Sequence, residues 1–360
     1  MNAAQPASYI GGTSAVSAGA RFDEQRLARY LEGVVKGFSG PLLVEQFEGG
    51  QSNPTYLLTT PDAKYVLRRK PAGVLLKSAH AVDREYRVTR ALFENGLPVP
   101  EPLVLCEDDD VIGTMFYVMR HVPGRIFWNG LMPDLTRDER AAVYDSANET
   151  LARLHLVDYQ RLGLGDYGRP GNYFARQVSR WSRQYEASKT CDLPEIDRLI
   201  AWLPGAVPDE GGLSSLVHGD YSFHNLLIHP TEPRVVAAID WELSTVGHPL
   251  GDLTYHMMDW FRPEGADVRG TLLGKDLGAL GIPTAEEYAA RYRDRTGFVI
   301  DPMLPFYRAF NLFRVAAILQ GIAGRARDGV QTAANASEII TRIEPLAKAA
   351  WAQAQIAGAL

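Results

Sequence analysis

The sequence predicts an α+β fold of two lobes, a five-stranded antiparallel sheet with one helix followed by a mostly helical lobe. The chain has 360 residues, which is long for a single hydrophobic core. Short β-like runs separated by turn residues fill its first third, whereas capped helical patterns dominate the rest. The composition changes near Pro123, so we place the lobes at residues 23–122 and 123–360, after a disordered tail at residues 1–22.

The first lobe begins with a helix that Asp23 can cap. Alternating or continuous apolar runs bounded by Gly, Pro, Asn and Asp then predict five strands, at residues 42–47, 55–60, 65–68, 102–106 and 114–119. A helical pattern at residues 78–95 follows the third strand, and Gly96 and Pro98 terminate it. These elements give a sheet with one helix inserted after its third strand.

The second lobe carries two capping-box signatures. Thr136 with Glu139 opens one long helix, and Thr284 with Glu287 opens another. A short β-rich block lies between residues 216 and 240, and residues 305–356 have an almost wholly helical pattern. This lobe is therefore helical around a small β-rich centre.

Composition excludes several classes of function. The formal net charge of −6 gives no bias toward nucleic acid, and no apolar run approaches the length of a membrane span. The first twenty residues lack the basic and apolar regions of a signal peptide. The two cysteines, Cys106 and Cys191, are far apart, which favours a reducing compartment. We expect a cytoplasmic protein that binds neither nucleic acid nor membrane, and its oligomeric state is left open.

Three polar residues in the β-rich block point to phosphoryl transfer. Asp220 precedes Asn225 by five positions and Asp240 by twenty, and Asp240 ends an apolar run. Phosphoryl transfer needs one carboxylate to orient the attacking hydroxyl and accept its proton. It also needs an amide oxygen and a second carboxylate to hold Mg²⁺, which prefers a few hard oxygen ligands.

The segments around these residues resemble the aminoglycoside phosphotransferase and choline kinase superfamily. His-Gly-Asp-Tyr at 218–221, Asp-Trp-Glu at 240–242 and Gly-His-Pro-Leu-Gly-Asp-Leu at 247–253 are most similar to its subgroup of kinase-like domains fused to acyl-CoA dehydrogenases. The resemblance covers roughly residues 23–345 and implies a bilobal protein-kinase-like fold. It implies Asp220 as the catalytic base, Asn225 and Asp240 as Mg²⁺ ligands, and His218 and Asp252 as structural supports of the loop.

The same resemblance implies a nucleotide site in the first lobe. The turn formed by Gly49, Gly50, Gln51, Ser52 and Asn53 would cover the phosphates of ATP, although it also fits a plain hairpin turn. Arg68 stands where protein kinases carry a phosphate-binding Lys, and Glu85 would be its partner, although Arg69 and Lys70 are close enough to compete. Residues 117–122 would form the hinge at adenine, with Met119, His121 and Val122 lining it.

The resulting hypothesis is an ATP- and Mg²⁺-dependent small-molecule kinase that phosphorylates an alcohol group. The subgroup favours a hydroxyacyl-CoA or related metabolite as the small-molecule hydroxyl acceptor. Two alternatives stay open, an aminoglycoside-type antibiotic phosphotransferase and a non-catalytic nucleotide-binding pseudokinase module. His224 either contacts the substrate or caps the loop.

Overall fold

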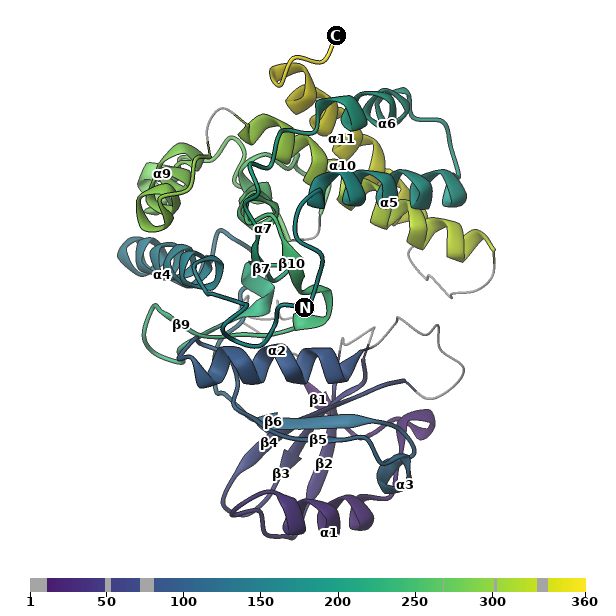
Figure 1. The fold of residues 1–360 in the computed structure, drawn as a ribbon, viewed down its shortest axis with the longest axis vertical. Helices are drawn as coiled ribbons and strands as arrows, with labels where there is room; N and C mark the ends of the chain where they lie inside the picture. Colours follow the sequence, from purple (N-terminus) through teal and green to yellow (C-terminus); the bar gives the residue numbers. More distant parts are fainter. Residues whose placement is uncertain (1–11, 49–52, 72–80, 268, 301–302, 329–335) are drawn as a thin grey trace, which may run out of the picture.

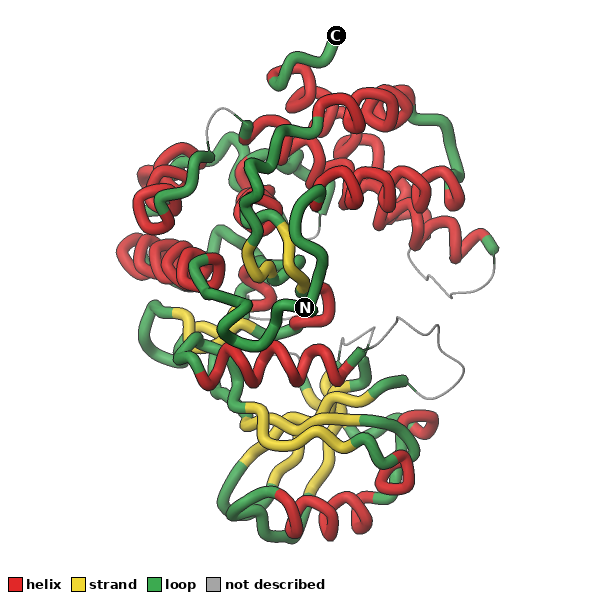
Figure 2. The backbone as a smooth tube through the Cα atoms, viewed as in Figure 1, coloured by secondary structure: helices red, strands yellow, loops and turns green. Residues whose placement is uncertain are grey.

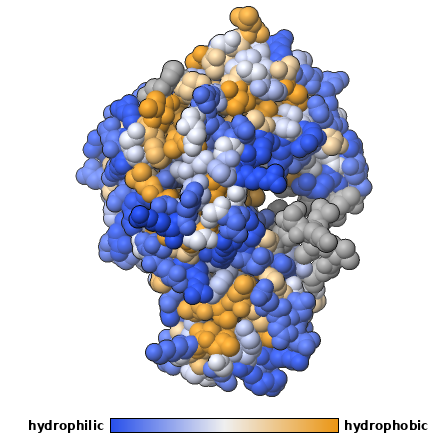
Figure 3. Space-filling view, viewed as in Figure 1, coloured by the Kyte–Doolittle hydropathy of each residue, from blue (hydrophilic) through white to orange (hydrophobic). Residues whose placement is uncertain are grey.

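The computed structural model describes residues 12–48, 53–71, 81–267, 269–300, 303–328 and 336–360. They form two lobes, one built on a sheet and one mostly helical, as Figure 1 shows. In Figure 2 most strands gather in the first lobe, and helices surround two short strand pairs in the second. Hydrophilic side chains cover most of the face seen in Figure 3, and apolar ones gather over the N-terminal sheet.

The N-terminal lobe is a six-stranded antiparallel sheet in the order β1-β2-β3-β4-β6-β5. Its strands are β1 (Thr13–Ser14), β2 (Leu43–Phe47), β3 (Thr55–Thr59), β4 (Lys64–Arg69), β5 (Pro102–Cys106) and β6 (Phe116–Arg120). Helices α1 (Glu24–Val34) and α2 (Val82–Glu94) cover opposite faces of the sheet, and α3 (Asp109–Ile112) follows β5 (Figure 1). The five expected strands are all present, and β1 is a sixth.

The strand β1 corrects the expectation of a disordered tail at residues 1–22. Residues 1–11 lie outside the described part, but Thr13 and Ser14 pair with β2. The next residues then cross the sheet: Arg69 donates to the Ala20 carbonyl at 2.9 Å, and its guanidinium lies 5.3 Å from the Phe22 ring centroid. The sequence offers no strand signal there, because two residues are too few to show a period.

Side-chain alternation along β4 places Arg68 and Arg69 on opposite faces of the sheet. Leu67 packs in the cluster under α1, together with Leu27 and Leu31 of that helix. Val66 packs with Val82 on the α2 side instead. Since successive strand residues point to opposite faces, Arg68 lies on the α2 face and Arg69 on the α1 face.

The C-terminal lobe has eight helices within the described ranges, α4 (Arg137–His155), α5 (Tyr173–Ser188), α6 (Pro194–Ala206), α7 (Leu250–His256), α8 (Leu277–Leu280), α9 (Ala285–Thr296), α10 (Leu304–Arg327) and α11 (Ala336–Ile356). Its strands form two antiparallel pairs, β7 (Ser215–Val217) with β10 (Thr245–Gly247) and β8 (Leu226–Ile228) with β9 (Val235–Ala238). Both predicted capping boxes are present: Thr136 with Glu139 opens α4, and Thr284 with Glu287 opens α9. Among the described helices, none is long and apolar enough to cross a bilayer.

Candidate active site

The loop that carries Asp220 connects β7 to β8 and turns sharply at Gly219. Gly219 has a φ of +84°, and a Cβ there would lie 2.4 Å from the Leu243 carbonyl oxygen. Only glycine combines this backbone conformation with so close an approach. The loop therefore reaches the lobe surface at one fixed point, directly after the buried strand β7.

Asp252 at the start of α7 holds this loop from below. Its carboxylate accepts the backbone N–H of His218 at 2.6 Å and of Gly219 at 2.8 Å. His155 lies 3.3 Å from the same carboxylate through Nε2. Burial alone would raise the pKa of Asp252, but these groups outweigh it and lower the pKa. The family resemblance gives Asp252 the role of supporting this loop, and these contacts are compatible with that prediction.

His218 is fully buried and supports the loop from the other side. Its Nε2 lies 2.9 Å from the Ile239 carbonyl oxygen, one residue before Asp240. Its ring also lies 4.6 Å from the Trp241 ring, measured between centroids. The side chain thus connects the Asp220 loop to the residues that follow β9, and its structural role stays a prediction.

Asp220 is held as a carboxylate. Burial would raise its pKa, but the neighbouring groups, His224 first and then the Tyr255 hydroxyl, outweigh it and hold the pKa well below its usual range. The Asn225 amide nitrogen also donates to Asp220 Oδ2 at 2.9 Å. A carboxylate with several donors is suited to orienting a hydroxyl and is a weak base before transfer begins.

Asn225 and Asp240 present oxygen atoms at the same cavity wall. The Asn225 amide nitrogen faces two acceptors of Asp220, the backbone oxygen and Oδ2, both at 2.9 Å. Its side-chain oxygen therefore faces away from Asp220. Asp240 follows β9 with a left-handed φ of +65°, which turns its carboxylate out of the strand. A carboxamide and a carboxylate oxygen are hard donors, and they fit a Mg²⁺ ion.

Arg68 joins the two lobes beside these groups. Its Nε lies 3.0 Å from Glu85 Oε2, and its NH2 lies 3.0 Å from Asp240 Oδ1. Glu85 is buried and also accepts from the Asn53 amide at 2.8 Å and the Tyr117 hydroxyl at 3.1 Å. Burial raises the pKa of Glu85 and the charge of Arg68 opposes that shift. We treat the pair as ionised because the guanidinium contacts two carboxylates.

A cavity of about 300 Å³ lies between the lobes at this point. Its polar lining includes Asp220, Asn225, Asp240 and Arg68, together with Glu48, Thr55, Arg120, His121 and His224. Its apolar part comes from both lobes: Phe47, Val66, Pro100, Met119, Val122, Ile126, Leu227 and Ile239. The cavity thus combines polar and apolar lining residues from both lobes, as small-molecule sites commonly do.

The structure brings most of the predicted residues to this cavity. Met119, His121 and Val122 line it, and their role as a hinge stays a prediction. Asn53 and Glu85 lie behind Arg68, outside the cavity lining. Gly49, Gly50, Gln51 and Ser52 lie outside the described residues. Sequence reasoning missed Tyr255, Trp128 and Arg269, which surround His224 and Asp220. No local pattern marks these three, because each reaches the site from a distant segment.

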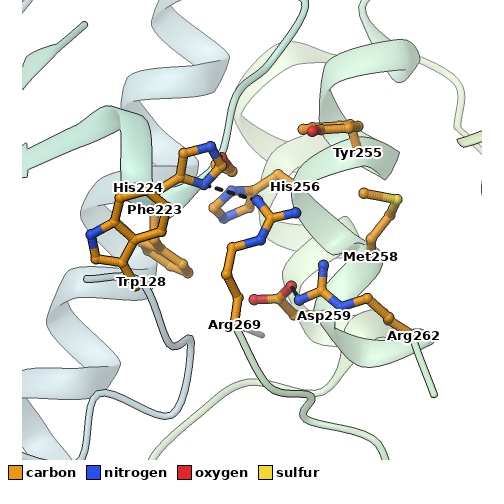
Figure 4. A pocket seen from close by; sticks show the side chains of 10 residues that line it. Trp128, Phe223, His224, Tyr255, His256, Met258, Asp259, Arg262 and Arg269 are labelled. Atoms are coloured by element: carbon orange, nitrogen blue, oxygen red, sulfur yellow. Dashed lines mark hydrogen bonds and ion pairs between the residues drawn. The ribbon is translucent and has the colours of Figure 1, made fainter. Parts of the chain in front are cut away.

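A smaller pocket opens beside Asp220, and His224 and Trp128 line both spaces. In Figure 4 Arg269 extends toward His224, and Arg262 and Asp259 lie on the far side. Arg262 NH2 lies 2.5 Å from Asp259 Oδ1. Among the lining side chains of this pocket, two are guanidinium groups and one is a carboxylate.

Comparison with known proteins identifies the relatives of this chain. The family model described as "Phosphotransferase enzyme family" matches residues 43–291. Acyl-CoA dehydrogenase family member 11 of Gallus gallus is 45% identical over 343 residues, covering 94% of this chain and 44% of that protein. The chain thus spans less than half the length of this curated relative.

Solved structures share the fold. A Ralstonia eutropha protein provisionally described as an aminoglycoside phosphotransferase is 48% identical, with a TM-score of 0.85 over 93% of this chain and 99% of that one. An aminoglycoside phosphotransferase solved with ADP and hygromycin B is 17% identical, with a TM-score of 0.57 over 91% of this chain and 98% of that one. At that identity the second likeness concerns the fold alone.

Proposed function

The chain belongs to the phosphotransferase enzyme family, and from this premise we propose that it transfers the γ-phosphoryl group of ATP to an alcohol group of a small molecule. The observation that carries the proposal is the placement of Asp220, Asn225 and Asp240 on one wall of the cavity between the lobes. Arg68 stands at the same wall, paired with Glu85. Catalysis of this kind depends on positioning and on neutralising charge more than on covalent chemistry.

Asp220 acts on the acceptor hydroxyl in this proposal. Its carboxylate accepts the hydrogen bond of that hydroxyl and directs the oxygen lone pair at the phosphorus. Because its donors hold its pKa low, Asp220 takes the proton only late, as the new P–O bond forms. The bond between the γ-phosphorus and the β,γ-bridging oxygen breaks as the new one forms, ADP leaves with that oxygen, and Asp220 passes the proton on to solvent.

Asn225, Asp240 and Arg68 serve the phosphates. The side-chain oxygens of Asn225 and Asp240 would hold Mg²⁺, which when bound supplies neutralisation of phosphate charge. Arg68 places its guanidinium at the same wall, beside Asp240. The planar fork of donors on a guanidinium can bind phosphate oxygens. The apolar slot formed by Val66, Leu227 and Ile239 would take the adenine ring.

The charges beside Asp220 bear on the acceptor. An acceptor with several amino groups needs a wall of carboxylates free to bind it, whereas Asp259 and Asp267 here are already paired with Arg262 and Arg269. This arrangement disfavours a polycationic antibiotic. Together with the 45% identity to acyl-CoA dehydrogenase family member 11, it supports a hydroxyacyl-CoA or related metabolic alcohol.

The test is the consumption of ATP by the purified chain with Mg²⁺ and defined panels of hydroxyacyl-CoAs, amino alcohols and aminoglycosides. We expect one panel to be phosphorylated. Asp220→Asn should then lower kcat by about 10²–10⁴-fold, the usual contribution of a positioned acid–base group, and leave the KM for ATP unchanged. The matched control is Asp166→Asn, because Asp166 is an exposed carboxylate that pairs with Arg87 on the surface.

Two results would decide against the proposal. An Asp220→Asn variant that turns over at the wild-type rate would remove Asp220 from the chemistry. Binding of Mg·ATP without phosphorylation of any panel would instead favour the alternative function, a non-catalytic nucleotide-binding pseudokinase.

A further inference from the structure

We propose that His224 is a positioning residue for Asp220, kept by Arg269 in the tautomer whose Nε2–H faces the carboxylate. The inference rests on the proposed phosphotransferase function, and it adds a residue that the catalytic motif does not include. His224 lies four residues after Asp220, in the single turn Phe223–Asn225, and Arg269 reaches it from 45 residues further along the chain.

The contacts of Nδ1 determine the tautomer. Arg269 NH1 lies 3.0 Å from His224 Nδ1, and a guanidinium can only donate. Nδ1 must therefore offer its lone pair. The Ser222 hydroxyl lies 2.7 Å from the same nitrogen and 3.2 Å from Nε2, and in this tautomer it can donate to the first or accept from the second. A neutral imidazole with a lone pair on Nδ1 carries its proton on Nε2.

The proton on Nε2 then faces Asp220. Nε2 lies 3.7 Å from Asp220 Oδ2, which is longer than a direct hydrogen bond, so the attraction joins the N–H dipole to the carboxylate charge. Asn225 donates to the same oxygen at 2.9 Å. Asn225 as a hydrogen-bond donor and Nε2 at longer range thus both face Oδ2, and the Tyr255 hydroxyl also acts on this carboxylate.

The ring itself is clamped. Trp128 stacks on it, with ring centroids 5.4 Å apart and planes inclined by 14°. Arg269 is fixed in turn by Asp267, whose carboxylate lies 2.6 Å from NH2 and 3.0 Å from Nε. Asp267 also lies 3.2 Å from NH1 of the buried Arg262. The ion pairs of Asp267 with Arg262 and Arg269 hold the Arg269 side chain in one orientation. Figure 4 shows its guanidinium directed at His224.

A capping role alone would not need this arrangement. A loop cap requires one hydrogen bond to the loop backbone, whereas among its described contacts His224 meets Ser222, Arg269 and Asp220 through side-chain atoms. Capping of the loop and positioning of Asp220 predict different kinetic results when the N–H donor at the Nε2 position is removed or restored.

The first experiment is independent of turnover. In protein labelled with ¹⁵N at histidine, two-bond correlations between ring nitrogens and carbon-bound protons distinguish the two tautomers. The His224 signals are assigned by their loss in His224→Gln. We expect Nδ1 unprotonated and Nε2 protonated, and a mixture of tautomers in Ser222→Ala/Arg269→Met, which lacks both donors to Nδ1. A wild-type His224 with its proton on Nδ1, or an unchanged tautomer in the double variant, would overturn the proposal.

The second experiment measures kinetics on an acceptor from the panel. His224→Leu should lower kcat by about 10–100-fold through misplacement of Asp220, with an unchanged KM for ATP. His224→Gln should recover most of this loss, because its amide N–H can stand near the Nε2 position. Equal losses in both variants would mean a structural role, and no loss in either would mean no role in positioning.

His229→Gln is the matched control. His229 Nδ1 also accepts hydrogen bonds, from the backbone N–H of Glu232 at 3.0 Å, but it lies in a turn away from the cavity. Its spectrum therefore provides an internal example of the same tautomer, and its substitution should leave kcat unchanged. Should the proposed function fail because no acceptor reacts, the ¹⁵N result still decides whether Arg269 sets the tautomer.

Discussion

At the scale of single residues, the site contains a buried charge that would destabilise the fold without its ion-pair partner. Glu85 is buried and is held by Arg68, Asn53 and Tyr117. Arg68 in turn contacts Asp240 in the other lobe. One guanidinium thus has two tasks, the burial of Glu85 and the presentation of a cation at the cavity wall, and two substitutions can separate them.

Arg68→Met should destabilise the fold and weaken ATP binding together. A buried carboxylate without its partner costs about 3–5 kcal/mol of unfolding free energy. Losing a charged donor costs about 1.5–3 kcal/mol of binding, or tenfold or more in the Kd for ATP. The double variant Arg68→Met/Glu85→Gln should regain most of the stability but none of the ATP affinity, as measured by urea unfolding and calorimetric titration. Recovery of both would show that Arg68 has no contact with nucleotide.

The sequence was most informative about residues whose partners are near in the chain. Asp220, Asn225 and Asp240 were predicted from spacing and resemblance, and their roles stay predictions until the variants are measured. The Arg68–Asp240 contact joins residues 172 positions apart, and no local pattern reports such a pair. The same holds for Trp128 and Arg269, whose positions follow from the packing of the C-terminal lobe.

At the scale of elements, the Asp220 loop depends on a conformation that only one residue type tolerates. Gly219 and Gly163 both have a positive φ, but a Cβ at Gly163 would meet nothing within 4 Å, whereas one at Gly219 would collide with Leu243. The two glycines therefore separate the cost of backbone conformation from the cost of collision.

Gly163→Ala should cost about 1–2 kcal/mol, the usual penalty of a left-handed conformation. Gly219→Ala should cost about 1–3 kcal/mol more, because the loop must shift away from Leu243, and it should also lower kcat. Chemical denaturation of the two variants checks the difference. Equal stabilities would show that the loop yields without strain.

Helices and strands were predicted well where polar capping residues or turn residues mark their ends in the sequence. The capping boxes at Thr136 and Thr284 were found because each uses two polar residues three positions apart. Strand β5 was predicted with its observed bounds, Pro102–Cys106, since turn residues flank it on both sides. Strand β1 was missed because its pairing with β2 is imposed by tertiary contacts rather than by its own sequence.

At the scale of the whole molecule, two buried histidines should make stability depend on pH. Burial lowers the pKa of His248 to about 4, with the charge of His155 adding to the shift. Burial also lowers the pKa of His256 to about 3, and a hydrogen bond to the Tyr221 backbone opposes this shift only in part. Between these values and the ordinary histidine pKa of about 6.5, the unfolded chain binds protons that the folded chain does not.

Stability should therefore fall as the pH is lowered from about 6.5 toward 4. Each histidine contributes a slope of about 1.4 kcal/mol per pH unit, so together they take up about two protons on unfolding near pH 5. Urea unfolding at several pH values measures the slope. In His256→Phe, whose ring would pack among Tyr221, Phe223 and Tyr288, uptake should fall by about one proton. An unchanged slope would mean that His256 is protonated in the folded protein.

The N-terminal segment across the first sheet has a practical consequence for where a shortened chain can begin. A boundary chosen from sequence would fall at Asp23. Such a truncation would remove the Ala20 carbonyl and the Phe22 ring, which both contact Arg69. It would also remove β1, which pairs with the edge of β2. An uncovered strand edge invites pairing with other chains. Fragments intended for crystallisation or screening should therefore begin before Gly12, so that the sheet keeps its native border.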